Sequence, residues 1–190
     1  MCFQRGSTDP LRLRRVATSE LTAGETAAIR ALLVTAFGDD PDERFGDDDW
    51  DHALGGVHYV LDDGAQIVGH AALVERELHV AGRPLRTGYV EAVATAPARQ
   101  GRGLGTRIMT QVNADIRAGF ELGALGTGWH AFYERLGWLR WRGPSSVRVP
   151  DGERRTPDED GYILVLPTAS TRLLDLDAPI SCDWRSGDVW

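Results

Sequence analysis

One glycine-rich segment constrains the fold of this chain more than any other feature. It reads Arg99-Gln-Gly-Arg-Gly-Leu-Gly105 and lies between an apolar, strand-like stretch and a helical stretch. Glycines at a strand-to-helix junction let several backbone N–H groups point at one place, and the helix start adds the positive end of its dipole. The segment therefore predicts a diphosphate-binding loop, within which Arg99, Arg102 and Arg107 would pair with further phosphate oxygens.

The hydrophobic pattern places this loop in a wider order of elements. The stripe Leu104, Ile108, Val112 and Ile116 is typical of a helix that packs on a sheet. Thr22-Ala-Gly-Glu25 has the spacing of a capping box, and Asp49 is expected to cap a short helix that follows it. The predicted helices cover residues 22–37, 49–54, 102–118 and 129–136.

Alternating and β-branched segments between these helices predict strands, with Asp63-Gly64 as a turn and Gly69 as a bulge. They cover residues 11–17, 57–61, 65–80, 85–95, 122–125, 138–141 and 162–166. This order predicts an α/β fold with a mixed sheet, antiparallel in its N-terminal half and followed by a parallel strand–helix–strand crossover. Without repeats or a flexible linker, residues 1–190 are predicted to form a single domain.

Composition excludes several classes of protein. All 21 basic residues are Arg, so the chain has neither a P-loop lysine nor a lysine for a pyridoxal phosphate Schiff base. Cys2 and Cys182 are too few for a disulfide framework, and the histidines lack metal-binding spacing, so we expect no metal. No spanning apolar stretch and no secretory signal stand out, which predicts a cytoplasmic protein without a membrane partner.

Acidic residues are concentrated between Asp39 and Asp51. Eight carboxylates stand there against Arg44 alone, so the whole formal net charge of −7 falls on this segment. It is either a solvated loop or an electrostatic funnel for a cationic ligand. Both interpretations disfavour a nucleic-acid partner, because phosphates would be repelled.

The glycine-rich loop also fits part of the dinucleotide fingerprint. Gly101 and Gly103 match its first two glycines, and Glu121 lies at the distance expected of a ribose-binding acid. However, Thr106 occupies the third glycine position. The loop also follows a run of antiparallel strands, where a dinucleotide-binding half would begin with a βαβ unit.

Three segments in order resemble the GNAT N-acetyltransferase superfamily. Gln100-x-x-Gly103-x-Gly105 resembles its acyl-CoA pyrophosphate motif, Gly88–Thr95 resembles the preceding strand, and Ala131–Trp138 resembles its second signature. Along most of its length the chain is similar to the aminoglycoside 2′-N-acetyltransferases, most specifically in the terminal segment Cys182–Trp190. The acidic segment is longer than the family pattern, and Gly126 stands where the family has a substrate-contacting Ser.

The resemblance implies a GNAT fold and acetyl-CoA as cosubstrate. It also implies direct acetyl transfer to the 2′-amine of an aminoglycoside, antibiotic resistance and a homodimer. The residues implied to bind acetyl-CoA are Val93, Ala94, Thr95, Gln100, Gly101, Arg102, Gly103, Leu104 and Gly105. Those implied to bind substrate, partly from the tail over residues 167–190, are Asp40, Asp49, Glu91, Ala92, Gly126, Asp158, Glu159, Asp188 and Trp190. Asp39 is a rival of Asp40, because the alignment slips across the acidic segment.

Two residues are expected to carry the chemistry. Glu91 is the one acid between Glu77 and Asp115, and a carboxylate in an apolar strand is unfavourable unless it is hydrogen-bonded or reaches a cleft. We predict that it is the general base, acting through water, with a structural carboxylate as the alternative. Tyr133 is the predicted general acid for the departing sulfur, since a phenol is protonated at neutral pH; its alternative is a core aromatic.

Other functions remain open from the sequence. The same enzyme class could act on another polyamine or a cell-wall amine. A non-catalytic acyl-CoA-binding regulator would retain the glycine-rich loop, and an NAD-binding enzyme is a more distant alternative.

Overall fold

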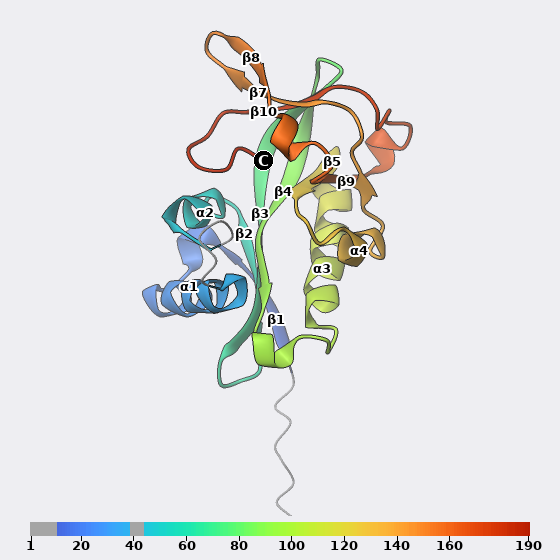
Figure 1. The fold of residues 1–190 in the computed structure, drawn as a ribbon. Helices are drawn as coiled ribbons and strands as arrows, with labels where there is room; N and C mark the ends of the chain where they lie inside the picture. Colours follow the sequence, from blue (N-terminus) through green and yellow to red (C-terminus); the bar gives the residue numbers. More distant parts are fainter. Residues whose placement is uncertain (1–10, 39–43) are drawn as a thin grey trace, which may run out of the picture.

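The computed structural model describes residues 11–38 and 44–190 of the chain. A ten-stranded mixed sheet runs through this described part. Helices α1 and α2 lie on one face of the sheet and α3 and α4 on the other (Figure 1). Three buried apolar clusters form the core: one is centred on α3, another on α1 and α2, and the third consists of strand and tail residues.

The strands, in chain order, are β1 (Arg12–Ala17), β2 (Val57–Asp62), β3 (Ile67–Val80), β4 (Arg83–Thr95), β5 (Leu122–Gly126), β6 (Leu139–Arg140), β7 (Ser145–Val149), β8 (Gly152–Arg155), β9 (Ile163–Pro167) and β10 (Ile180–Asp183). The α-helices are α1 (Ala23–Phe37), α2 (Asp47–His52), α3 (Leu104–Gly119) and α4 (His130–Glu134). Short 3-10 helices are η1 (Thr18–Glu20), η2 (Pro97–Arg99), η3 (Pro157–Glu159) and η4 (Ala169–Thr171).

The sheet topology confirms the predicted fold class. Strands β1 to β4 pair antiparallel in sequence, and β5 then lies parallel to β4 after the α3 crossover. The order of strands along the sheet is β6-β9-β5-β4-β3-β10-β7-β8, and β2, with β1 beside it, pairs with β3 off this path. The parallel β4–β5 junction, with α3 across it, is therefore the place where the glycine-rich loop lies.

Local signals in the sequence produced the helices that flank this junction. Thr22 caps α1 as expected, since its side chain accepts from the Glu25 N–H while Glu25 accepts from the Thr22 N–H at 3.0 Å. The predicted stripe of α3 is buried against the sheet. A bulge lies beside Gly69, where a Cβ would come within 2.7 Å of Ile108 Cδ1, so glycine makes room for α3.

One prediction about the elements was wrong, and three strands were not predicted. Helix α2 begins at Asp47 with Gly46 as its N-cap, and Asp49 instead reaches back so that its Oδ2 accepts the Gly46 N–H at 2.7 Å. The segments over residues 145–155 and 180–183 form β7, β8 and β10, which the sequence pattern did not indicate. These strands are four or five residues long, and β8 is exposed throughout, so no alternation distinguishes them from loop.

One buried amide fixes α4 relative to α3. Asn113 on α3 accepts the Trp138 Nε1–H at 3.0 Å and donates to the Leu136 carbonyl at 3.0 Å, just after α4. We expect Asn113→Ala to lower the free energy of unfolding by about 2–4 kcal/mol, because two buried polar groups lose their partners. Urea denaturation measures this. Gln111→Ala, on the same helix, is the control, and an equal loss in both variants would contradict the prediction.

Candidate active site

The glycine-rich loop adopts the backbone that a phosphate-binding turn requires. Gly101 and Gly103 have φ of 72° and 76°, in the left-handed region, and Gly103 is the N-cap of α3. A Cβ at either glycine would meet nothing within 4 Å, so the space above the loop is open. The first N–H groups of α3 have no partner inside the helix. The loop therefore fits a diphosphate held by backbone donors.

The side chains around this loop have different roles. Gln100 and Arg102 are exposed, and Arg102 makes no ion pair with any described residue, so both are free to meet a ligand. Arg99 instead donates to Asp63 Oδ2 at 2.6 Å, and Arg107 donates to a backbone carbonyl near β1. In this structure Arg99 and Arg107 thus fasten the loop and α3 to their neighbours, and their pairing with phosphate stays a prediction. The side chain of Leu104 is buried, so only its backbone is available to a ligand.

Strand β4 separates from β5 before it reaches the loop. The two strands pair at Thr87–Tyr89, and beyond that point a bulge in β4 places Ala92 and Val93 opposite one residue of β3. Ala92 has a φ of 52°, which is rare for a residue with a Cβ. The bulge at Ala92 and Val93 therefore separates Glu91 from Ala94 and Thr95.

The end of β4 meets α3 and α4 at Gly105. A Cβ there would lie 3.2 Å from the Phe132 ring and 3.8 Å from Thr95 Cγ2. The structure thus brings Thr95 and the glycine-rich loop together with α4, which carries Tyr133. Ala94 is buried and Val93 packs against the α3 core cluster, so their backbone is what β4 presents to a ligand.

Glu91 lies in an ion pair that the sequence did not reveal. Its Oε1 accepts from Arg185 at 2.6 Å, and the two side chains are 14% and 17% exposed. Burial raises the pKa of Glu91, while the positive charges of Arg185 and Arg76 oppose that shift and the charge of Asp188 adds to it. A carboxyl with a raised pKa is suited to accept a proton near neutral pH.

Tyr133 is a core residue whose hydroxyl carries a proton at neutral pH. Its ring packs edge-on against Phe132 and Trp138, with centroids 4.9 and 6.0 Å away. Burial raises the pKa of its hydroxyl above the ordinary value, so the phenol stays protonated at neutral pH. The two interpretations of Tyr133 are therefore compatible with one geometry.

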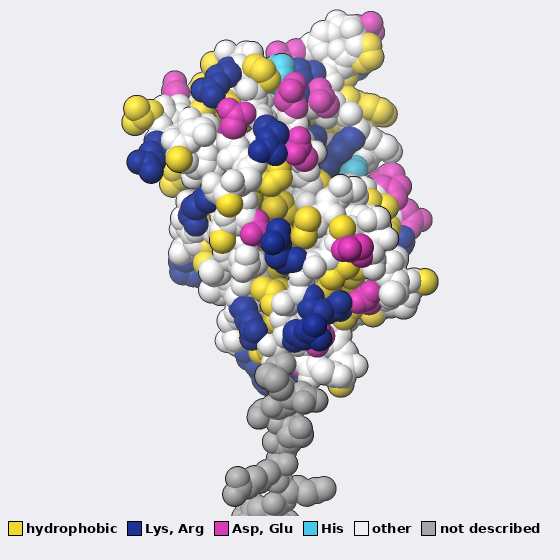
Figure 2. All heavy atoms as spheres, turned by 180° about the vertical axis from the view of Figure 1, so that it is seen from behind, with side chains coloured by type: hydrophobic (Ala, Val, Ile, Leu, Met, Phe, Trp, Pro, Cys, Tyr) yellow, Lys and Arg dark blue, Asp and Glu magenta, His cyan; other side chains and the backbone are white. Residues whose placement is uncertain are grey.

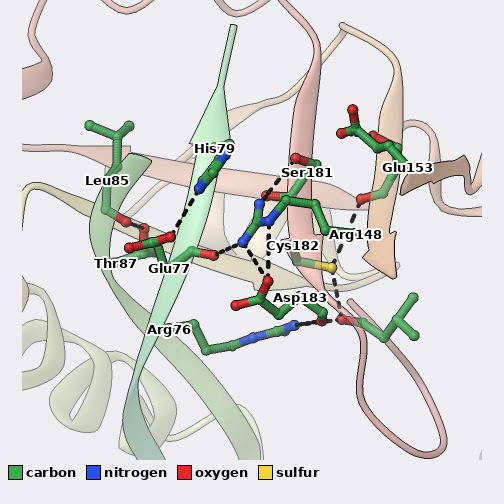
Figure 3. A network of polar contacts seen from close by, with 12 residues as sticks. Arg76, Glu77, His79, Leu85, Thr87, Arg148, Glu153, Ser181, Cys182 and Asp183 are labelled. Carbon is green, nitrogen blue, oxygen red and sulfur yellow. Dashed lines mark hydrogen bonds and ion pairs between the residues drawn. The ribbon is translucent and has the colours of Figure 1, made fainter. Parts of the chain in front are cut away.

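Arginines on two strands anchor the C-terminal tail (Figure 3). Arg148 of β7 donates to the carbonyls of Ser181 and Glu77 at 2.7 and 2.8 Å. Arg76 of β3 donates to the carbonyl of Val189 at 2.9 Å. These bonds hold the tail against β3 on both sides of its last loop, at Ser181 and at Val189.

The anchored tail joins elements that are far apart in the sequence. Ser186 contacts α2, with its carbonyl 2.7 Å from His52 Nε2 and its hydroxyl 3.2 Å from Asp48. Trp190 donates its indole N–H to Thr156 at 3.0 Å, just before η3. A Cβ on Gly126 would lie 3.4 Å from the Trp190 carbonyl carbon, so the tail lies over the end of β5.

Most of the predicted acidic residues converge around this tail. Burial raises the pKa of Glu159, and the charges of Asp188 and Asp158 raise it further, so these three carboxylates lie near one another. Asp188 acts in the same sense on Glu91. Asp49 lies on α2, which the tail contacts, although its carboxylate is engaged in the helix cap. Asp40 and its rival Asp39 lie outside the described residues.

Several residues at this site escaped the sequence analysis. Arg185 and Arg76 place their guanidinium groups 5.6 and 4.5 Å from the Tyr89 ring centroid. Tyr89 is fully buried, and its hydroxyl has no hydrogen-bond partner among the described residues. Its position two residues before Glu91 on one strand was a usable signal, because such residues share a face.

Within ranges 11–38 and 44–190, no three His, Cys, Asp or Glu side chains are grouped to hold a metal ion. Basic, acidic and apolar side chains are interspersed on the face seen in Figure 2. Among the helices of the described part, none has both the length and the apolar character that a bilayer crossing requires.

Comparisons with known proteins point to one family. Residues 17–140 match the family model described as an acetyltransferase (GNAT) domain. The chain is 42% identical over 181 residues to an aminoglycoside 2′-N-acetyltransferase of Mycolicibacterium fortuitum, covering 93% of this chain and 91% of that protein.

Solved structures support the fold. A GNAT family N-acetyltransferase from Escherichia coli in complex with CoA has a TM-score of 0.64 at 19% identity, covering 92% of each chain. A GNAT family acetyltransferase from Brucella melitensis in complex with acetyl-CoA has a TM-score of 0.56 at 19% identity, covering 84% of this chain and 88% of that one.

Proposed function

Because the chain belongs to the GNAT acetyltransferase family, we propose that it transfers the acetyl group of acetyl-CoA to the 2′-amino group of aminoglycosides. The similarity over nearly the whole chain to an enzyme of that name supports this activity. The observation in the structure that carries it is the meeting of Glu91, at the β4 bulge, with the carboxylate-rich tail.

Each part of the reaction has a candidate group. The neutral amine attacks the thioester carbon, forming the C–N bond as the C–S bond breaks. Glu91 takes the proton of the amine through water, and Tyr133 gives a proton to the departing thiolate. The backbone N–H of Val93 polarises the thioester carbonyl. The loop at Gly101–Gly103 holds the pyrophosphate, with Arg102 and Gln100 beside it.

The acceptor side is suited to a polycation. Asp158, Glu159 and Asp188 gather around the tail, and Glu91 faces the same region. Carboxylates spread over such a surface attract several ammonium groups at once. Acetylation then removes one ammonium charge, which weakens the attraction of the antibiotic to RNA phosphates.

This charge pattern predicts a specific salt dependence. The KM for a tetracationic aminoglycoside is expected to rise severalfold between about 0.03 and 0.3 M salt, because exposed charge pairs are screened. The KM for acetyl-CoA is expected to change less. Steady-state kinetics at fixed pH measures both constants. An aminoglycoside KM that does not change with salt would mean that the acidic residues are solvated and do not attract the substrate.

A matched pair of acceptors tests the proposed function. Kanamycin B carries a 2′-amino group where kanamycin A carries a 2′-hydroxyl, so coenzyme A release is expected with the first and not with the second. Mass spectrometry of the product should locate the new acetyl group at the 2′ nitrogen. Turnover of spermidine alone would identify a different amine as substrate. Binding of acetyl-CoA without turnover of any amine would identify a regulator.

The wider role follows from the reaction. Expression of the chain in a sensitive bacterium is expected to raise the inhibitory concentration of kanamycin B and not of kanamycin A. The reaction would take place in the cytoplasm, where acetyl-CoA is formed. The family resemblance also supports a homodimer, which light scattering would detect as twice the chain mass of 20.8 kDa.

A further inference from the structure

Two buried histidines connect the β4 bulge to Thr18, which directly follows β1. His70 Nδ1 lies 2.8 Å from the Ala92 carbonyl oxygen, and His70 Nε2 lies 2.9 Å from His58 Nδ1. His58 Nε2 in turn lies 2.9 Å from the Thr18 hydroxyl. Both histidines are fully buried, and the proposed reaction does not use either of them.

The hydrogen bonds from Thr18 through His58 and His70 to Ala92 all run in one direction. A carbonyl oxygen can only accept, so His70 Nδ1 must donate to Ala92. Burial lowers the pKa of His70 to about 3 and that of His58 to about 4, so both rings are neutral at neutral pH. His70 Nε2 therefore accepts from His58, and His58 Nε2 accepts from Thr18. The Thr18 hydroxyl thus donates to His58 rather than to the Gly56 carbonyl, 3.2 Å away.

The peptide held by His70 is the one that contains the proposed oxyanion donor. Ala92 has its left-handed φ of 52° without being a glycine, so the bulge needs a contact that stabilises it. The described peptide bonds are all trans, and in a trans peptide the N–H points opposite to the preceding C=O. Fixing the Ala92 carbonyl toward His70 therefore also fixes the Val93 N–H away from it.

We propose that His70, supported by His58 and Thr18, is a positioning residue for acetyl transfer. By holding the Ala92 carbonyl it orients the Val93 N–H toward the thioester oxygen, and it touches neither acetyl-CoA nor the acceptor amine. This assignment rests on the proposed function for the identity of the reaction. It goes beyond that function in giving the buried histidine pair a role in rate.

Two polar variants of His70 separate this role from packing. The amide of Asn reaches the position of Nδ1 and can still donate to Ala92, whereas the amide of Gln reaches the position of Nε2. We expect His70→Gln to lower kcat about tenfold or more, compared with the 10²–10³-fold that complete loss of an oxyanion donor costs. KM for acetyl-CoA and for kanamycin B should change less than about threefold, and His70→Asn should recover most of the rate.

A buried neighbour provides the control for stability. Val60 on β2 pairs directly with His70 and is fully buried, and Val60→Ala leaves the hydrogen-bonded chain intact. It is expected to lower the melting temperature while changing kcat less than about twofold. An equal loss of kcat in Val60→Ala and His70→Gln, or equal rates for the Gln and Asn variants, would overturn the proposal. If a His70 variant does not fold, Thr18→Val replaces it in the same assays, with the same pattern expected at a smaller loss.

A spectroscopic readout needs no acceptor amine. In wild type labelled with ¹⁵N-valine, acetyl-CoA should shift the Val93 amide signal more than S-ethyl-CoA does, because the thioether lacks the carbonyl oxygen. In His70→Gln that difference should vanish, and its persistence would overturn the proposal. If wild type turns over no aminoglycoside, the proposed function fails, while this measurement still decides the role of His70.

Discussion

Replacing Glu91 with Gln is expected to lower kcat by about 10²–10⁴-fold, the range that a positioned general base contributes. Gln fills the same volume and can still accept a hydrogen bond from Arg185, but it cannot take the proton of the amine. Affinity for acetyl-CoA should stay within about twofold of wild type, because Glu91 lies on the acceptor side of the bulge. Steady-state kinetics and calorimetric titration with acetyl-CoA measure the two quantities. A kcat near that of wild type would make Glu91 a structural carboxylate.

The ion pair of Glu91 with Arg185 leads to a second test of Glu91, through the pH dependence of kcat/KM. A general base works in its deprotonated form, so kcat/KM should rise with pH through the pKa of Glu91. Burial raises that pKa, and the positive charge of Arg185 opposes the rise. Arg185→Gln removes this charge, so the acid limb of the pH profile, where kcat/KM rises with pH, should move to higher pH. Arg154→Gln, an exposed arginine on β8, makes the same change of charge and should leave the limb in place. An acid limb that stays still or moves to lower pH in Arg185→Gln would contradict the assignment.

Removal of the Tyr133 hydroxyl is expected to have the second large effect. Tyr133→Phe should lower kcat by about 10²–10³-fold, since the coenzyme A thiolate would leave without a proton donor. The ring should still pack on Phe132 and Trp138, so the melting temperature should change little. Stopped-flow detection of the free thiol, together with thermal denaturation, tests both statements.

A second tyrosine provides the control for this variant. Tyr162 is 50% exposed, and Tyr162→Phe should leave kcat within about twofold of wild type. If Tyr133→Phe also keeps the wild-type rate, Tyr133 is a core aromatic and another group protonates the sulfur.

The parts of the fold that the sequence predicts well are those that depend on neighbours in the chain. The capping box at Thr22, the stripe of α3 and the left-handed glycines of the loop each act within a few residues of one another. The parallel crossover follows from them, because a strand, a loop and a helix in this order leave few topologies. The predicted placement of the glycine-rich loop between β4 and α3 is confirmed for this reason.

The acceptor side could not be predicted in the same way. Arg185 contacts Glu91 across 94 residues of chain, and Ser186 contacts Asp48 across 138. Such pairs leave no periodic pattern, because their partners are chosen by the path of the tail across the sheet. The histidine pair depends on β2–β3 register for the same reason. Asp49 shows a related limit, because its carboxylate reaches back to cap its own helix.

The two halves of the site differ in how evolution can alter them. The residues proposed to hold acetyl-CoA and to carry the chemistry all lie between Glu91 and Tyr133, so most of the proposed donor half belongs to one stretch of chain. The proposed acceptor half is assembled from α2, η3 and a tail that three separate regions hold in place. We expect mutations in those regions to change which amine is recognised without disturbing thioester chemistry. Divergence among relatives should therefore accumulate around the tail, and exchanging tails between homologues should transfer acceptor preference while the donor stays the same.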